Sequence, residues 1–176
     1  DLSGFARKPP RPTATMTLTR DGPNGPEVLL GLRSETMAAF PGYWAFTGGG
    51  VSRVDAAAVD SFSVLDVEHG KAIACILRET CEELGIAPNG DHVVVIDETA
   101  RFDVIKDKAN WLPHAEDCNI PVNTDNINIL GHRITPPFGP VQFDNAFIHF
   151  HCGDWQSVPE IDLEPQTEFD LSLIHI

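Results

Sequence analysis

The sequence has few basic residues: 12 Lys and Arg stand against 26 Asp and Glu among 176 residues, a formal net charge of −14. A nucleic-acid backbone repels such a chain, so we expect no nucleic-acid partner. No apolar run approaches the roughly 20 residues of a membrane-spanning helix, so no membrane segment is expected. The four cysteines are widely spaced, and no two of them form a C-x-x-C motif. This usage is typical of reduced thiols in the cytoplasm rather than of disulfides or a zinc site.

The remaining composition, with 42% hydrophobic residues, is sufficient for one hydrophobic core. We expect a Pro-rich arm over residues 1–12 and a single domain over 13–176 with a truncated C-terminus, and we give residues 171–176 no structural role. Strands on both sides of a well-formed helix favour an α/β or α+β fold with a mixed sheet. The predicted strands are 13–19, 27–33, 43–47, 92–97 (buried), 127–134 and 143–152, and the predicted helices are 71–84, ending at Gly85, and a looser region at 107–117.

The most informative segment lies at the end of the predicted helix and contains Arg78, Glu79, Glu82 and Glu83. Helical spacing crowds the three carboxylates on one face, and two of them lie in the last turn, where the helix dipole disfavours anions. Each effect costs about 0.3–1 kcal/mol. A divalent cation explains this placement, and oxygen ligands favour Mg²⁺ or Mn²⁺. The alternative to metal binding is that these glutamates form an ordinary acidic helix face exposed to solvent.

Three glycines, Gly48, Gly49 and Gly50, follow the strand predicted at 43–47. Without β-carbons, their backbone can approach an ion or a phosphate closely. We therefore expect a bend at these glycines, with the carboxyl groups of all three glutamates converging on it within metal-bridging distance. Bound in this way, a divalent cation allows an acidic protein to hold a polyanionic diphosphate.

With these residues the sequence resembles the Nudix hydrolases. Their signature is a Gly, five residues, an acid, a spacer and then Arg-Glu-apolar-x-Glu-Glu-x-Gly-apolar. Gly49 and Asp55 match its first half, with Asp in place of the usual Glu, and residues 78–86 match its second half, with Thr80 at an apolar position. The spacer contains 22 residues instead of the usual seven, which implies an insertion at about 56–70 that includes the alternative acid Glu68.

The resemblance extends beyond this signature. Residues 29–34, 42 and 46–49 have the spacing of the coenzyme-A-type Nudix signature, and residues 133–137 and 143–147 resemble a segment of a branch that includes a coenzyme A diphosphatase. The resemblance implies an α/β/α sandwich and metal-dependent hydrolysis of a diphosphate linkage in a small molecule, with coenzyme A or an acyl-CoA as candidate substrates. Departures at Ala38 and Thr47 keep ADP-ribose, a dinucleotide or a nucleotide sugar open as substrates, and the altered acid keeps open a non-catalytic nucleotide-sensing module. The oligomeric state also stays open, with a homodimer as one option.

The resemblance also implies roles for individual residues. Glu79, Glu82 and Glu83 would hold Mg²⁺ or Mn²⁺ together with the Gly49 carbonyl, and Glu79 is a ligand or a base that orients water. Arg78 would hold the carboxylates in place, and Asp55 either accepts a hydrogen bond from Arg78 or is an ordinary loop aspartate. The further substrate-site candidates are Gly48, Gly50, Arg33, Asp55, Phe143 and Glu168, the last being a later acid that competes with Glu160, Asp162, Glu164 and Asp170.

Overall fold

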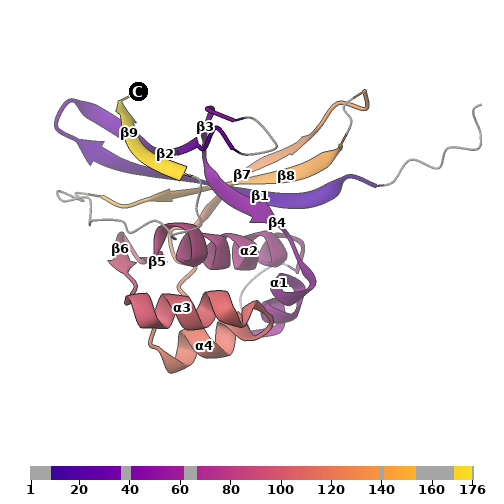
Figure 1. Cartoon of the computed structure of the whole chain (residues 1–176), viewed down its shortest axis with the longest axis vertical. Helices are drawn as coiled ribbons and strands as arrows, with labels where there is room; N and C mark the ends of the chain where they lie inside the picture. Colours follow the sequence, from indigo (N-terminus) through magenta and orange to yellow (C-terminus); the bar gives the residue numbers. More distant parts are fainter. Residues whose placement is uncertain (1–8, 37–40, 62–66, 139–140, 154–168, 176) are drawn as a thin grey trace, which may run out of the picture.

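A computed structural model describes residues 9–36, 41–61, 67–138, 141–153 and 169–175. A mixed sheet forms one layer of the molecule, drawn above the helices in Figure 1. Its strand order is β3-β2-β1-β8-β7, with β4 paired to β1 and β9 paired to β2. β1 and β8 run parallel, and the other pairs are antiparallel. The strands are β1 (Arg11–Gly22), β2 (Gly25–Arg33), β3 (Trp44–Ala45), β4 (Thr47–Gly50), β7 (Asn128–Ile134), β8 (Phe143–His151) and β9 (Phe169–His175). The predicted mixed α/β architecture is confirmed.

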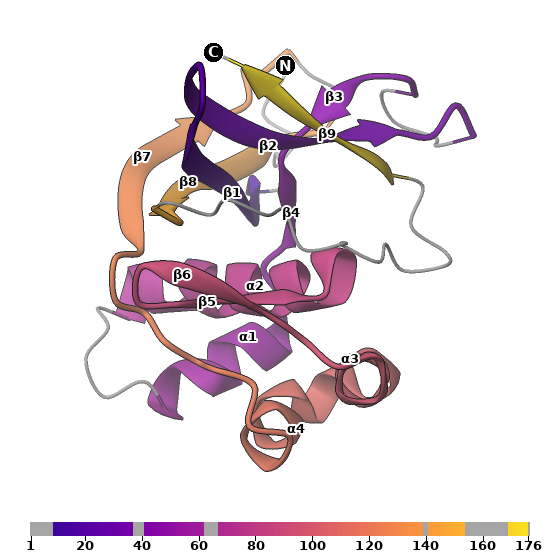
Figure 2. The same ribbon diagram turned by 90° about the vertical axis from the view of Figure 1, so that its left-hand side faces the viewer.

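Helix α2 (Val67–Leu84) lies against one face of this sheet, and the other helices lie beyond it (Figures 1 and 2). These are α1 (Arg53–Ala58), α3 (Glu98–Lys106) and α4 (Trp111–Asp117), with the 3₁₀ turns η1 (Val59–Ser61) and η2 (Lys108–Asn110). α2 ends at Gly85, whose φ of 62° is the left-handed conformation that favours glycine, and whose N–H donates to the Cys81 carbonyl at 3.0 Å. No helix in the described ranges is long and apolar enough to cross a bilayer.

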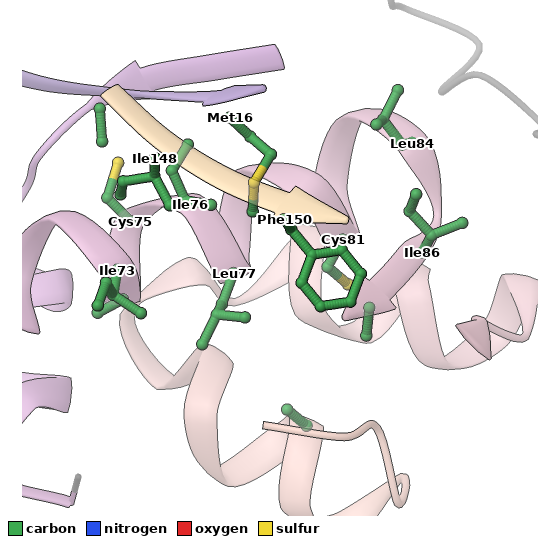
Figure 3. Packing of buried hydrophobic residues seen from close by; sticks show 14 of the residues in the cluster. Met16, Ile73, Cys75, Ile76, Leu77, Cys81, Leu84, Ile86, Ile148 and Phe150 are labelled. Atoms are coloured by element: carbon green, nitrogen blue, oxygen red, sulfur yellow. The ribbon is translucent and has the colours of Figure 1, made fainter. Parts of the chain in front are cut away.

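The core lies between the sheet and α2 (Figure 3). Alternate residues of β1 and β8 point toward the helix, because side chains of a strand alternate between its faces. The buried set from these strands and α2 includes Met16, Ile148, Phe150, Ile73, Ile76 and Leu77. Burial of each such side chain contributes roughly 1.5–3 kcal/mol. The alternate positions of β1 and β8 between them project from the opposite face of the sheet.

The three glycines form an edge strand rather than the expected bend. Residues 47–50 pair with residues 13–16 of β1, so that Gly48 lies opposite Thr15 and Gly50 opposite Thr13. A β-carbon on Gly48 would overlap the Ala14 carbonyl oxygen. Close approach of two backbones therefore explains Gly48, and a residue with a side chain would separate β4 from β1.

Other predicted elements differ in detail. The sequence predicts a buried strand over residues 92–97, but β6 (His92–Val95) is partly exposed, because among the described residues it pairs with β5 (Ile86–Asn89) alone, in a separate hairpin. α2 begins at Val67 instead of residue 71. α3 was not predicted, because its buried side chains include Arg101 beside Ala100 and Val104 and so form no purely apolar stripe. The segment that includes residues 171–175, given no role from sequence, pairs with β2 as β9.

Candidate active site

Arg78 is the centre of a buried cluster of carboxylates. Its Nε and Nη2 donate to the two carboxylate oxygens of Asp55 at 2.8 and 3.1 Å. Nη2 also lies 2.9 Å from Glu79 Oε1, and Nη1 lies 3.2 Å from Glu82 Oε1. Burial lowers the pKa of Arg78, but the hydrogen bond to Asp55 and the charges of Glu79, Asp55 and Glu82 outweigh it and raise that pKa. Arg78 therefore remains charged and holds the carboxylates by charge-assisted hydrogen bonds.

Asp55 reaches this cluster from the first turn of α1. The backbone N–H and the hydroxyl of Ser52 both donate to Asp55 Oδ2 at 2.8 Å, an arrangement similar to a helix capping box. With the two bonds from Arg78, a fully buried carboxylate receives four hydrogen bonds. Of the two readings of Asp55, the structure shows the acceptor of the Arg78 hydrogen bond rather than an ordinary loop aspartate.

Glu79 and Glu83 face the glycine strand from α2. A β-carbon on Gly49 would overlap the Glu79 carboxylate, and the Gly48 N–H donates to Glu83 Oε2 at 3.3 Å. Burial raises the pKa of Glu83 to about 8, with the neighbouring charge of Glu79 as the next cause. Burial likewise raises the pKa of Glu79, although the charge of Arg78 opposes the shift. The site therefore holds two carboxylates whose ionisation a nearby cation would favour.

The carboxylate of Glu82 is paired with two basic side chains, Arg78 and Lys108. Lys108 Nζ, from η2, lies 2.6 Å from Glu82 Oε2, while Arg78 holds Oε1, and the Glu82 side chain is only 4% exposed. The expected convergence of all three carboxylates on the glycines is therefore not seen: two are beside the glycines and one is paired with Arg78 and Lys108. Within the described ranges, no three His, Cys, Asp or Glu side chains form a group that could hold a metal ion.

The residues that are present nevertheless fit a hard divalent cation. Mg²⁺ commonly takes one or two protein carboxylates and completes its shell with water and substrate oxygens, and Glu79 with Glu83 supplies such a pair. The expected carbonyl ligand, that of Gly49, accepts a hydrogen bond from Cys75 Sγ at 3.8 Å. Burial, and then the charges of Asp55 and Glu79, raise the pKa of Cys75, so this thiol stays protonated.

A pocket of about 650 Å³ adjoins the glycine strand on the face of the sheet that is turned away from α2. Of the predicted substrate residues, Gly48, Gly50, Arg33 and Phe143 line it together with Gly49. The charge of Arg33 slightly opposes the rise in the pKa of Glu83, so this arginine of the pocket lining acts electrostatically on a carboxylate of the site. Asp55 is buried outside the lining, and Glu168 lies outside the described residues.

Sequence reasoning missed the basic residues that support the acidic helix. Arg101 of α3 is buried, and its guanidinium donates to the Glu82 carbonyl at 2.8 and 3.2 Å and to the Glu83 carbonyl at 3.1 Å. It thus satisfies the last carbonyls of α2 and offsets the unfavourable dipole there. Arg101 and Lys108 follow the motif by about twenty residues and no sequence pattern marks them, so only the fold reveals their role.

Comparison with solved structures identifies this architecture. The Nudix hydrolase from Alicyclobacillus acidocaldarius matches with a TM-score of 0.76 and 26% identity, over 96% of this chain and 79% of that one. The chain has the Nudix fold. A MutT/nudix family protein from Enterococcus faecalis matches with a TM-score of 0.52 and 18% identity, over 96% of this chain and 45% of that one. The Nudix domain of Shewanella oneidensis NrtR, complexed with ADP ribose, matches with a TM-score of 0.50 and 14% identity, over 98% of this chain and 79% of that one.

No protein-family model matches the sequence, and a search of curated proteins found no match. The last two structural matches establish the fold alone, because their identities are below 20%. The match to the Alicyclobacillus hydrolase, with the Arg-Glu-x-x-Glu-Glu helix in place beside the glycine strand, supports a Nudix-type pyrophosphatase.

Proposed function

We propose that the protein hydrolyses a diphosphate linkage in a nucleoside-diphosphate-linked compound, with Mg²⁺ or Mn²⁺ held by Glu79 and Glu83. The observation that carries this proposal is the pair of buried carboxylates against the backbone of Gly48 and Gly49, at the edge of the pocket. Two like charges at a buried site are unfavourable without a cation. A pocket bordered by glycine backbone leaves space for a phosphate group.

The protein residues would divide the work as follows. When bound, the divalent cation polarises phosphoryl oxygens, lowers the pKa of water and offsets the charge of the leaving phosphate. Glu83 would bind it, and Oε2 of Glu79, the oxygen that Arg78 does not hold, would either bind the cation as well or orient the attacking water. Arg78, fixed by Asp55, would keep the Glu79 carboxylate in position. Glu82 stays a proposed third ligand: Lys108 is 52% exposed and can turn to solvent to release Oε2.

We favour coenzyme A or an acyl-CoA as the substrate, on the residues that match the coenzyme-A-type signature. Among the described residues, the pocket lining contains Arg33 and Arg133 and no carboxylate side chain, which favours an anionic ligand even though the protein carries a charge of −14. ADP-ribose is the second candidate, because the matching domain of NrtR was solved with this ligand. All four cysteines are free, which supports a reducing compartment such as the cytoplasm.

A substrate panel tests the proposal. Purified protein is incubated with coenzyme A, acetyl-CoA, ADP-ribose, a dinucleotide and a nucleotide sugar, each with Mg²⁺, Mn²⁺ or EDTA, and products are identified by mass. We expect metal-dependent cleavage, which Glu83→Gln lowers by at least about 100-fold. Glu116→Gln, which neutralises an exposed carboxylate of α4, is the matched control. Cleavage that persists in Glu83→Gln contradicts the assignment, and metal binding without turnover on any substrate favours a sensing module.

A further inference from the structure

Asn145 of β8 has a fixed orientation on the pocket wall. The hydroxyls of Thr13 and Thr15 both donate to its Oδ1, at 2.9 and 3.2 Å. Because this oxygen accepts a hydrogen bond from each hydroxyl, the amide nitrogen Nδ2 lies on the side of the amide away from the two threonines. In the described part of the chain Asn145 Nδ2 has no protein acceptor, although Asn145 lines the pocket. This N–H₂ group is therefore available to a ligand in the pocket.

Arg133 of β7 lies beside this amide. It is directly opposite Asn145 in the antiparallel pairing of β7 and β8, so the two side chains project from the same face. Arg133 is exposed and also lines the pocket. Its Nη1 donates to the His132 carbonyl at 2.9 Å, and other N–H groups of the guanidinium remain for a ligand.

The strand register connects this pair to the glycine strand. Gly50 lies opposite Thr13, Thr13 opposite Asn145, and Asn145 opposite Arg133, so one row crosses β4, β1, β8 and β7. Neighbouring strands are about 4.8 Å apart, so the row spans about 14 Å. This is roughly the length of a nucleoside diphosphate. A diphosphate held at β4 would place the nucleoside along the row, toward Arg133.

We propose that Arg133 and Asn145 form a subsite for a second phosphate group, carried by the ribose of the substrate nucleotide. The inference rests on the proposed function for the position of the diphosphate. The Asn145 N–H₂ group and the Arg133 guanidinium offer only hydrogen-bond donors, and none of the described residues that line the pocket carries a carboxylate. A phosphate offers only acceptors to such a pair, and a guanidinium binds it with two parallel hydrogen bonds. Phe143, two residues before Asn145 and on the same face, is available to stack on the nucleobase.

Binding of nucleotide fragments tests this subsite without turnover. Dissociation constants of 5′-AMP, adenosine 3′,5′-bisphosphate and adenosine 2′,5′-bisphosphate are measured by calorimetry. We expect the wild type to bind one bisphosphate at least about tenfold more tightly than 5′-AMP. Arg133→Met removes this preference. Asn145→Asp, which can keep both threonine hydrogen bonds, removes it by placing a negative charge beside the phosphate. Lys106→Met, which removes the same charge from α3, retains it.

The outcomes separate the subsite from the hydrolytic function. Equal affinity for all three nucleotides, no binding of any, or a preference that survives Arg133→Met overturns the subsite. The isomer that binds more tightly shows which ribose oxygen carries the phosphate. A clear preference in a protein that cleaves no diphosphate supports the subsite and refutes the hydrolytic function.

Discussion

The substitution Glu83→Gln is expected to abolish activity and yet stabilise the metal-free protein. Burial raises the pKa of Glu83 to about 8 in the folded state, from an ordinary value of 4.5. Between these two values the folded protein binds a proton at Glu83 that the unfolded chain has released. The contribution of Glu83 to the free energy of unfolding is therefore fully present below the unfolded pKa. It is lost as the pH rises through the folded pKa, by at most about 1.4 kcal/mol for each pH unit.

The size of the effect follows from this slope. From pH 5 to pH 7 the free energy of unfolding of the wild type in EDTA falls by up to about 2–3 kcal/mol through Glu83 alone. Glutamine is uncharged at every pH and can still accept the Gly48 N–H. Glu83→Gln is therefore expected to be more stable than the wild type at pH 7, by about 1–3 kcal/mol, and to lose most of the pH dependence.

Urea denaturation in EDTA at pH 5, 6 and 7, followed by the fluorescence of the three tryptophans, measures this difference. Glu82→Gln is the contrasting variant, because Glu82 is paired with Arg78 and Lys108. Neutralising it leaves a buried guanidinium with fewer partners, and we expect a loss of about 1–3 kcal/mol. Equal destabilisation by both substitutions, or a Glu83→Gln protein whose stability keeps the pH dependence of the wild type, would contradict the raised pKa of Glu83.

Three further outcomes can be measured with the same material. Gly48→Ala should lower the unfolding free energy by more than about 2 kcal/mol, whereas Gly50→Ala, whose β-carbon meets open space, should change it by less than about 1 kcal/mol; equal losses in urea denaturation contradict the strand contact. Asp55→Ala leaves the buried Arg78 without its main partner and should cost about 3–5 kcal/mol, again by denaturation. Mg²⁺ should raise the thermal midpoint more at pH 7.5 than at pH 5.5, because binding requires ionised Glu83, and an equal rise at both pH values in a thermal scan contradicts this ligand.

The sequence was sufficient to predict the elements whose patterns are local. The alternating residues of β1 and the helical period before Gly85 predict a strand and a helix, and both are present. Thr80, at a position where an apolar residue is usual, is fully buried because its hydroxyl donates to the Ile76 carbonyl at 2.6 Å within the same helix. Such a contact requires only four residues of sequence, so the helix tolerates the substitution without an unpaired buried group.

Contacts between distant segments could not be predicted in the same way. The pairing of Glu82 with Lys108 joins residues 26 positions apart, and the position of Lys108 depends on the fold of α3 and η2. From the motif alone, all three glutamates are equivalent candidates for metal ligands. Only tertiary structure distinguishes Glu79 and Glu83, beside the glycines, from Glu82, beside two cations. The strand β4 was missed for a similar reason, since its three glycines have low strand propensity and are held by pairing with β1.

The charges of the buried cluster indicate how much positive charge the site requires. Its ionisable members are the carboxylates of Asp55, Glu79, Glu82 and Glu83 and the basic groups of Arg78 and Lys108. Four carboxylates against the two cations that pair with them leave two negative charges when every group is ionised, and the charge of Arg33 offsets this excess only in part at Glu83. One divalent cation neutralises the remainder. Without the cation, burial and then the charge of Glu79 raise the pKa of Glu83 and favour its protonated form, so we expect metal and proton to compete for this carboxylate.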